Sequence, residues 1–422
     1  MGITMPQAIF NGENGYKWRI PSLVNAGGAL VAAACNNRTG ADWGYIELAV
    51  RISRDMGESW EDVKAIASPP ARVINEDISN TRTAFFIDPC MTVTKSGRIV
   101  MLVTFFPESK GIHDKKRLEP KKSAYTSFDR VNCPVVYDRD DNYYIIMPNG
   151  AVIDRARAKT AYTVGGLGDL YKGDEYVGNI FLNGAKGRGE GRTTFGAPLK
   201  APKRSYVFML KSDDSGESWS EPVDITGMIT DERDGAFAGV APGTGLTTES
   251  GRLIFPLYTE KGTICIYSDD DGITWHRNPN SQYTGNKGEW TAAEIDETIY
   301  AFGRDKGKVP CTVSYDNGIT WQKGEKNPIK APFCQKNALL LGDRLLISHP
   351  SGKERENGVI SVGDLSYGKH GNFKGISWRK EEISINSGHF AYSCMARLDD
   401  NTVAVLYEDS PSGSIVFDKF SI

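Results

Sequence analysis

The chain has 422 residues, which exceeds a typical single domain, although all-β barrels and propellers can reach this length as one unit. Its 50 Lys and Arg residues nearly balance its 53 Asp and Glu residues, which argues against a dedicated nucleic-acid or membrane-surface binder. The 45 glycines and 20 prolines indicate many turns, and no run of 18 apolar residues predicts membrane insertion.

The first notable element is an apolar segment, WRIPSL at residues 18–23, that contains a basic residue. The guanidinium of Arg19 stays charged at any relevant pH, so burying it requires an anionic partner or hydrogen-bond acceptors. We therefore expect either an acid of the protein or an anion from outside beside it. Pro21 is expected to end or kink the strand and so to present Arg19 to that partner.

Four octapeptides share the pattern Ser-x-Asp-x-Gly-x-Ser/Thr-Trp, and each follows an apolar segment. They are SRDMGESW (53–60), SDDSGESW (212–219), SDDDGITW (268–275) and SYDNGITW (314–321). The Asp carboxylate can accept backbone N–H groups within a turn, Gly can adopt positive φ, and Trp can pack between sheets. These boxes are therefore predicted to be structural hairpin turns and not active sites.

The spacing of the boxes predicts the architecture. The last three begin at residues 212, 268 and 314, and each gap of 56 or 46 residues corresponds to about one four-stranded propeller blade. The first gap, of 159 residues, must hold an insertion, and residues 107–204 contain short apolar stretches joined by Asn-Gly and Gly-Asp turns. We predict an all-β, six-bladed propeller from residues 1–106 and 205–422, with a small β-rich subdomain, 107–204, near the active-site rim.

Common catalytic and metal motifs are missing from the sequence. The seven cysteines are scattered, with no C-x-x-C pair, and the five histidines show no metal-ligand spacing. Arg19 and Arg304 lie in segments that precede boxes, which suggests equivalent positions in two blades. Because inner strands converge at one end of a propeller, several arginines could form one anion site there.

Several segments resemble the bacterial sialidases, a group of glycoside hydrolases. WRIP resembles the F/Y-R-I-P motif of that family, and the four octapeptides resemble its Asp-boxes. RTGADWG, GEWTAAEIDETIYAFGR, HPSGKERENG and HFAYSCMARL resemble the segments that hold its catalytic residues. The insertion is similar to one in the large clostridial- and pneumococcal-type sialidases, so the resemblance covers nearly the whole chain.

The resemblance implies a role for each matching position. Arg19, Arg304 and Arg355 would form a triad around the sialic acid carboxylate. Asp42 would be the general acid and base, and Tyr392 the nucleophile.

Other matching positions would support these groups. Glu289 would be the base partner of the tyrosine, with Glu294 as a second choice, because both precede Arg304. Glu408 would orient the first arginine, and Arg38 and Asp88 would contact the sugar.

Two positions depart from the family pattern. Asn36 stands where the family usually has an Asp, and the spacing of 15 residues between Glu289 and Arg304 is one shorter than in the relatives. A turn in the intervening segment could absorb that deletion.

The expected function is that of a retaining exo-sialidase acting on glycoproteins, glycolipids and mucins, without a metal or organic cofactor. We expect a monomer that is secreted or cell-surface as part of a longer precursor. A non-catalytic glycan-binding propeller is a different possibility, which the joint presence of the triad, Asp42 and Tyr392 disfavours.

A third possibility is intramolecular or intermolecular sialyl transfer by the same residues. An apolar rim would favour it by excluding water, and the tyrosines of the insertion could supply such a rim or could form the insertion's own small core. These tyrosines are Tyr143, Tyr144, Tyr171 and Tyr176.

Overall fold

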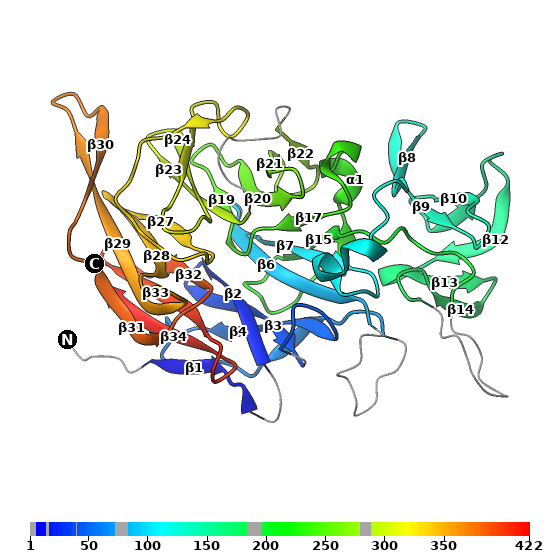
Figure 1. The fold of residues 1–422 in the computed structure, drawn as a ribbon, viewed down its shortest axis with the longest axis horizontal. Coiled ribbons are helices and arrows are strands. Elements are labelled where there is room, and N and C mark those ends of the chain that lie inside the picture. The colour runs from blue at the N-terminus through cyan, green and yellow to red at the C-terminus, as the bar shows by residue number, and fades with distance from the viewer. Residues whose placement is uncertain (1–5, 14–16, 39, 72–82, 184–195, 279–287) are drawn as a thin grey trace.

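The computed structural model describes residues 6–13, 17–38, 40–71, 83–183, 196–278 and 288–422. Six small sheets surround one axis, and a seventh sheet forms a lobe at one side (Figure 1). The predicted all-β, six-bladed propeller is thus confirmed. The described helices are short: η2 (Gly111–Arg117), η3 (Gly166–Gly168), α1 (Thr226–Ile229) and η4 (Glu232–Asp234).

The first three blades use strands that follow one another outwards from the axis. Blade one is β2 (Lys17–Ala26), β3 (Ala29–Asn37), β4 (Ile46–Ser53) and β5 (Lys64–Ala67). Blade two is β6 (Phe85–Val93), β7 (Ile99–Phe106), β15 (Tyr206–Ser212) and β16 (Val223–Asp224), with β18 (Gly243–Thr244) parallel to β6. Blade three is β17 (Ala238–Val240), β20 (Leu253–Thr259), β21 (Thr263–Ser268) and β22 (His276–Arg277), with β19 (Leu246–Thr247) beside β20.

The other three blades repeat the pattern. Blade four is β23 (Trp290–Ile295), β24 (Thr298–Gly303), β25 (Cys311–Ser314) and β26 (Gln322–Lys323). Blade five is β27 (Asn337–Leu341), β28 (Arg344–Pro350), β29 (Glu356–Tyr367) and β30 (Phe373–Trp378), with β31 (Ile383–His389) on β29. Blade six is β32 (Ser393–Arg397), β33 (Thr402–Asp409), β34 (Ser414–Ser421) and β1 (Gln7–Phe10).

Blade six closes the ring, because its outer strand β1 comes from the other end of the chain and pairs with β34. This pairing covers an edge that would otherwise be exposed. Phe10 of β1 joins a buried cluster with Leu406 and Phe417. Strands packed between neighbouring blades are buried on both faces; all eight residues of β7 are buried, for example. Burial on both faces explains the nearly continuous apolar sequences of these strands.

The four boxes form turns between the third and fourth strands of blades one to four, and the predicted geometry is confirmed. In the second box, Asp214 Oδ1 accepts the Ser218 N–H at 2.8 Å. Gly216 has a φ of 91°, and its N–H donates to Ser212 Oγ at 2.9 Å. The Trp219 indole N–H closes the turn on the Gly216 carbonyl at 3.0 Å.

Replacing Asp214 by Asn should reduce stability in a pH-dependent way. Hydrogen bonds from Ser218 lower the pKa of Asp214 from 3.8 to about 2. The carboxylate therefore stabilises the fold fully above pH 4, and this contribution is lost as the pH falls towards 2. We expect Asp214→Asn to lower Tm by roughly 2 °C at pH 7. Thermal melts from pH 7 to pH 3 should show the difference shrinking, whereas exposed Asp174→Asn should have no such effect.

The seventh sheet lies between β7 and β15 in the sequence, and its strands pair in chain order. They are β8 (Tyr125–Phe128), β9 (Val131–Tyr137), β10 (Tyr143–Ile146), β11 (Ala151–Ile153), β12 (Lys159–Val164), β13 (Asp169–Lys172) and β14 (Glu175–Asn179). Cys133, Ile145 and Ile153 form a small buried cluster within it. The division of the chain into two domains at residues 107 and 205 stays a prediction.

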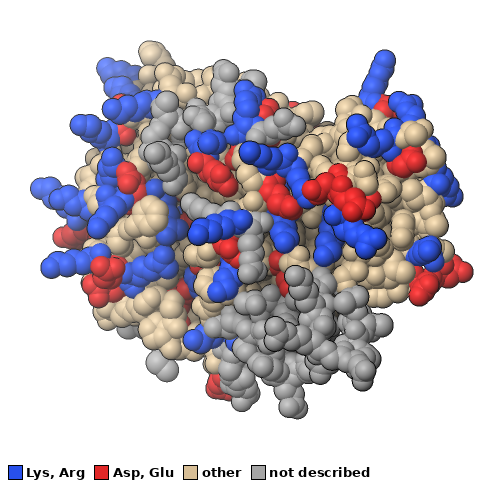
Figure 2. Space-filling view, turned by 45° about the vertical axis from the view of Figure 1, so that its right-hand side comes forward, with Lys and Arg blue, Asp and Glu red and all other residues tan. Residues whose placement is uncertain are grey.

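The surface and the cysteines give little indication of a partner. Basic and acidic side chains alternate over the face seen in Figure 2. In the described ranges, no helix is long and apolar enough to cross a membrane. All seven cysteines are unpaired, and only Cys311 is not buried.

Strand direction decides which residues meet. Because neighbouring strands in a blade are antiparallel, the first strand begins, the second ends and the third begins at the same end of the propeller. The box turns lie at the opposite end. All nine predicted site residues lie near the end of the propeller where first and third strands begin and second strands end, so the fold can gather them there.

Candidate active site

A cavity of about 320 Å³ lies at this end of the propeller, and all six blades line it. It contains seven of the nine predicted site residues: Arg19, Asp42, Asp88, Glu289, Arg304, Arg355 and Tyr392. Glu408 lies behind Arg19. Arg38 follows the end of β3 and does not line the cavity.

A bulge in β2 orients Arg19. The pairing of β2 with β3 shifts between Arg19 and Ser22, and Ile20 adopts a φ of 59°, an unusual value for a β-branched residue. The strand then continues to Ala26. Pro21 therefore does not end the strand. The bulge between Arg19 and Ser22, which includes Pro21, supplies the expected kink beside the cavity.

Arg19 has the internal acidic partner that the sequence required. Its Nε donates to Glu408 Oε1 at 3.0 Å, and its Nη1 pairs with Asp42. Glu408 is 0% exposed, and its Oε2 accepts the Ile20 N–H at 3.2 Å. Burial alone would lower the pKa of Arg19, but the charges of Glu408 and Asp42 outweigh burial and raise it. The guanidinium is thus held in place from behind.

Glu289, Arg304 and Tyr392 form the centre of the cavity. Tyr392 Oη donates to Glu289 Oε1 at 2.8 Å, and Arg304 Nη1 donates to Tyr392 Oη at 3.0 Å. Arg304 Nη1 also pairs with the second oxygen of Glu289. The three side chains form a closed hydrogen-bonded group, and all three residues line the cavity.

Strands β23 and β24 explain why Glu289 and Arg304 are in contact. Glu289 immediately precedes β23 and Arg304 immediately follows β24, so the Arg304 N–H donates to the Glu289 carbonyl at 2.9 Å. Arg304 thus follows a second strand, whereas Arg19 lies on a first strand, so the predicted equivalence of their positions is wrong. Glu294 lies five residues further along β23, where it accepts the Glu249 N–H at 2.6 Å, and it does not reach Tyr392.

The electrostatics around Tyr392 favour a neutral phenol. Burial, and then the negative charge of Glu289, raise the pKa of Tyr392 well above its usual value. Three guanidinium groups approach its ring, with Arg355 at 5.5 Å and Arg19 and Arg304 at 5.9 Å from the ring centroid. The hydroxyl can therefore be activated only by a group that accepts its proton, and Glu289 is in contact with it.

Arg355 differs from the other two arginines. It lies in the loop between β28 and β29, and its backbone carbonyl accepts the Phe390 N–H at 2.9 Å. Among the described residues no acid forms an ion pair with its guanidinium. The side chain can therefore receive an anion from solution.

Asp88 forms another wall of the cavity. A bulge in β6 gives it a φ of 64°, and the Tyr258 hydroxyl donates to it at 3.4 Å. Burial, followed by the charges of Glu289 and Asp42, raises the pKa of Asp88 well above its usual value. The direction of this shift favours the neutral form of the Asp88 carboxyl group.

Several cavity residues were missed from the sequence. Aromatic side chains line the walls and the mouth, and the insertion adds two residues at the mouth. These residues are Phe106, Phe237, Tyr258, Phe333, Ile112 and His113. Among them, only the position of Tyr258 could have been inferred, because it lies near the end of the second strand of blade three, as Arg304 follows the second strand of blade four.

The four tyrosines considered for the rim lie elsewhere. Tyr143 packs against the insertion's own cluster, and the Tyr144 hydroxyl donates to Asp138. Tyr171 and Tyr176 contact each other, with ring centroids 5.8 Å apart. None of the four lines the cavity, so they do not form its rim.

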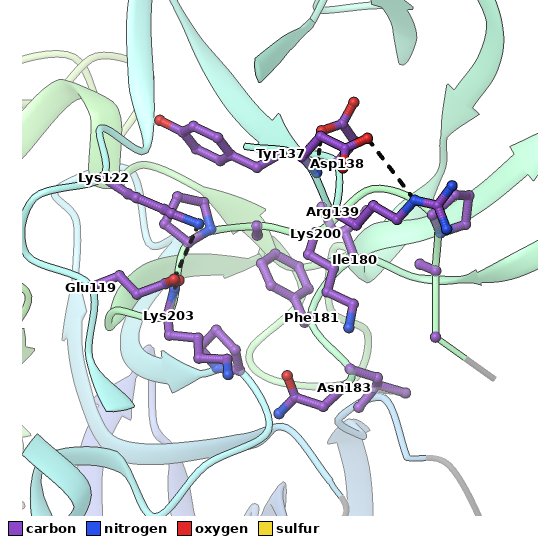
Figure 3. A pocket seen from close by; sticks show the side chains of 18 residues that line it. Glu119, Lys122, Tyr137, Asp138, Arg139, Ile180, Phe181, Asn183, Lys200 and Lys203 are labelled. Carbon is purple, nitrogen blue, oxygen red and sulfur yellow. Dashed lines mark hydrogen bonds and ion pairs between the residues drawn. The ribbon is translucent and has the colours of Figure 1, made fainter. Parts of the chain in front are cut away.

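A larger cavity, of about 660 Å³, is lined by residues between Pro107 and Lys203, all within the insertion (Figure 3). Lys122 Nζ pairs with Glu119 at 3.2 Å on one side, and Arg139 lies on the other. This cavity contains none of the nine predicted site residues and no group that resembles an activated nucleophile. The chemistry therefore favours the smaller cavity.

Comparisons with known proteins show the family of the chain. Models of the BNR repeat-like domain match residues 194–405 and 20–286. The anhydrosialidase of Macrobdella decora is 25% identical and the match covers 97% of this chain and 61% of the relative. Sialidase B of Streptococcus pneumoniae is 23% identical over 94% of this chain and 62% of the relative. The chain belongs to the BNR repeat-like family of sialidases.

Solved sialidase structures share the fold of this family member. The NanB sialidase of Streptococcus pneumoniae superposes with a TM-score of 0.81 at 22% identity, covering 100% of this chain and 70% of the other. The intramolecular trans-sialidase of Ruminococcus gnavus gives a TM-score of 0.79 at 23% identity, covering 99% and 97%. The chain spans less than two thirds of the two curated sialidases named above.

Proposed function

We propose that this chain is a retaining exo-sialidase that cleaves terminal α-linked sialic acid from glycoproteins, glycolipids and mucins. The observation that carries the proposal is the Tyr392 hydroxyl, held between Glu289 at 2.8 Å and Arg304 at 3.0 Å beside two further guanidinium groups. The names of its relatives support the same substrate class.

A tyrosine suits this substrate because the anomeric carbon of sialic acid bears a carboxylate. A carboxylate nucleophile would approach against like charge, whereas a neutral phenol does not. As the bond from Tyr392 Oη to the anomeric carbon forms, the phenol proton passes to Glu289. Arg304, which contacts both groups, stabilises the negative charge on the pair.

The other residues bind the substrate and handle the leaving group. Arg19, Arg304 and Arg355 hold the substrate carboxylate. When that carboxylate reaches Arg19, it takes over the contact now made by Asp42, which can then protonate the departing glycosidic oxygen. In the second step Asp42 removes a proton from water, and that water attacks the anomeric carbon. As the bond to Tyr392 Oη breaks, Glu289 returns the proton to the phenol, so the configuration is retained overall.

The product distinguishes this function from its alternatives. We expect time-resolved proton NMR of a reaction with sialyl-α2,3-lactose to show α-sialic acid as the first product. A first product of the β-anomer would exclude retention. Binding without any product over days would instead favour the non-catalytic glycan-binding propeller.

Intramolecular transfer is a second candidate, because the mouth of the cavity is partly apolar. Phe333 is 49% exposed and Ile112 is 37% exposed, and both line the cavity. Apolar side chains there would hinder the approach of water to the tyrosine-bound intermediate. The names of two similar proteins, an anhydrosialidase and an intramolecular trans-sialidase, support this second candidate. An anhydro sugar in the same NMR experiment would establish this outcome.

Removing Arg355 should weaken binding without loss of stability. Its guanidinium forms no ion pair within the described ranges, so Arg355→Ala leaves no described acid unpaired. We expect KM to rise about 10- to 100-fold, the effect of one charged hydrogen-bonded contact, with Tm unchanged. Arg19→Ala should raise KM and also lower Tm, because buried Glu408 loses its partner. Steady-state kinetics measure KM and thermal melts measure Tm, with the exposed Lys353→Ala as the control. An unaltered KM in Arg355→Ala would contradict the proposed arginine triad.

A further inference from the structure

The first turn of the insertion reaches the cavity beside Asp42. Helix η2 follows soon after β7, and it places His113 Nε2 3.6 Å from Asp42 Oδ2. The His113 ring is tilted against Trp43, with centroids 5.1 Å apart, and Lys110 Nζ lies 5.4 Å from the Trp43 ring centroid. His113 is still 44% exposed, so its ring is accessible from the mouth.

The position of the leaving group follows from the proposed role of Asp42. To protonate the glycosidic oxygen, a carboxyl oxygen of Asp42 must come within hydrogen-bond distance of it, about 2.6–3.2 Å. The first sugar of the leaving group is bonded to that oxygen, so it must lie beside Asp42. Arg19 contacts Oδ1 of Asp42, whereas the partly exposed His113 lies beside the other carboxylate oxygen, Oδ2.

We propose that His113, supported by Trp43 and Lys110, forms a subsite for the leaving sugar, which is a neutral pyranose. This inference rests on the proposed function. The imidazole can donate and accept hydrogen bonds to sugar hydroxyls, and its flat ring can contact the apolar face of a pyranose. The insertion then contributes to the choice of glycan, whereas the propeller holds the sialic acid.

A purely structural role for His113 has a different signature. If His113 only holds Asp42 in place, its loss should affect every substrate that needs protonation. A subsite for the leaving sugar, in contrast, affects only substrates that carry a sugar there. Methyl α-sialoside and sialyl-α2,3-lactose both have poor leaving groups, but only the second fills the subsite.

The experiment compares wild-type protein, His113→Ala and the control His370→Ala, which removes an exposed histidine elsewhere. For His113→Ala we expect kcat/KM on sialyl-α2,3-lactose to fall about tenfold, mostly through KM, the effect of about one lost hydrogen bond and ring contact. Its kcat/KM on methyl α-sialoside should stay within twofold of wild type. His370→Ala should match wild type on both substrates.

The other outcomes overturn the proposal. Equal losses on the two substrates would assign His113 to the positioning of Asp42, and no loss on either would remove it from the site. In both cases the wild-type protein still cleaves sialosides, so the proposed function stands. If wild-type protein cleaves neither substrate, the proposed function and the subsite both fail.

Discussion

Tyr392→Phe is expected to lower kcat on sialyl-α2,3-lactose by about three orders of magnitude or more, because loss of a covalent nucleophile removes the two-step path. The substitution removes only the hydroxyl that contacts Glu289 and Arg304. Glu289 keeps its ion pair with Arg304, so no buried charge is left without a partner. The fold and the binding of sialic acid should therefore persist.

Three measurements together test this expectation. Turnover is measured on the sialoside, the dissociation constant of an unsaturated sialic acid analogue by calorimetry, and Tm by thermal melting. Tyr258→Phe is the matched control, because Tyr258 also lines the cavity but its hydroxyl contacts Asp88 at 3.4 Å. Near-normal turnover in Tyr392→Phe, or an equal loss in Tyr258→Phe, would contradict the assignment of the nucleophile.

The architecture could be predicted because its signals are local and repeated. Each box must form its own turn, with Asp214 and Gly216 making contacts within eight residues of sequence. Counting residues between such turns then gives the number of blades. The closure of the ring by β1 gave no comparable signal, because Phe10 meets Phe417 only in the folded chain.

The charged residues of the site were easier to predict than its aromatic ones. An arginine in an apolar strand requires a partner, so Arg19 pointed to an acid, and the structure supplies Glu408, 389 residues away. An aromatic residue such as Phe333 is compatible with any core, and its sequence carries no sign that it borders a cavity. The choice between Glu289 and Glu294 needed only strand geometry, since five residues of β-strand separate them by roughly 16 Å.

Two further features depend on tertiary contacts that no local pattern encodes. The bulge at Ile20 lets β2 pass the cavity and still continue, whereas Pro21 alone suggested that the strand might stop. His113 comes from the insertion, and 70 residues with four strands, two of blade one and two of blade two, separate it from Asp42 in the sequence. Its contact with Asp42 exists because β7 ends at the cavity and the insertion starts there.

Asp42→Ala should reveal the acid through the leaving group. With sialyl-α2,3-lactose the departing oxygen needs a proton, so we expect kcat to fall by about 10²- to 10⁴-fold, the usual contribution of general acid catalysis. With 4-nitrophenyl α-sialoside the leaving phenolate is stable without a proton. Its release should be much less affected, although the second step, which needs a base for water, then limits turnover. We therefore expect the time course of 4-nitrophenol release to show a burst followed by slow turnover.

The contacts of Asp42 make the interpretation specific. Asp42→Ala also removes an anionic partner of Arg19, but Glu408 still holds that guanidinium, so substrate binding should change little. Asp42→Asn keeps the shape of the side chain and removes only its acid–base function, and it should behave like Asp42→Ala. If the burst of 4-nitrophenol in both variants slowed by the same factor as turnover of sialyl-α2,3-lactose, Asp42 would act by positioning Arg19 and the proton would have to come from another group. Because His113 Nε2 lies 3.6 Å from Asp42 Oδ2, His113→Ala would then be the next variant to compare on the same pair of substrates.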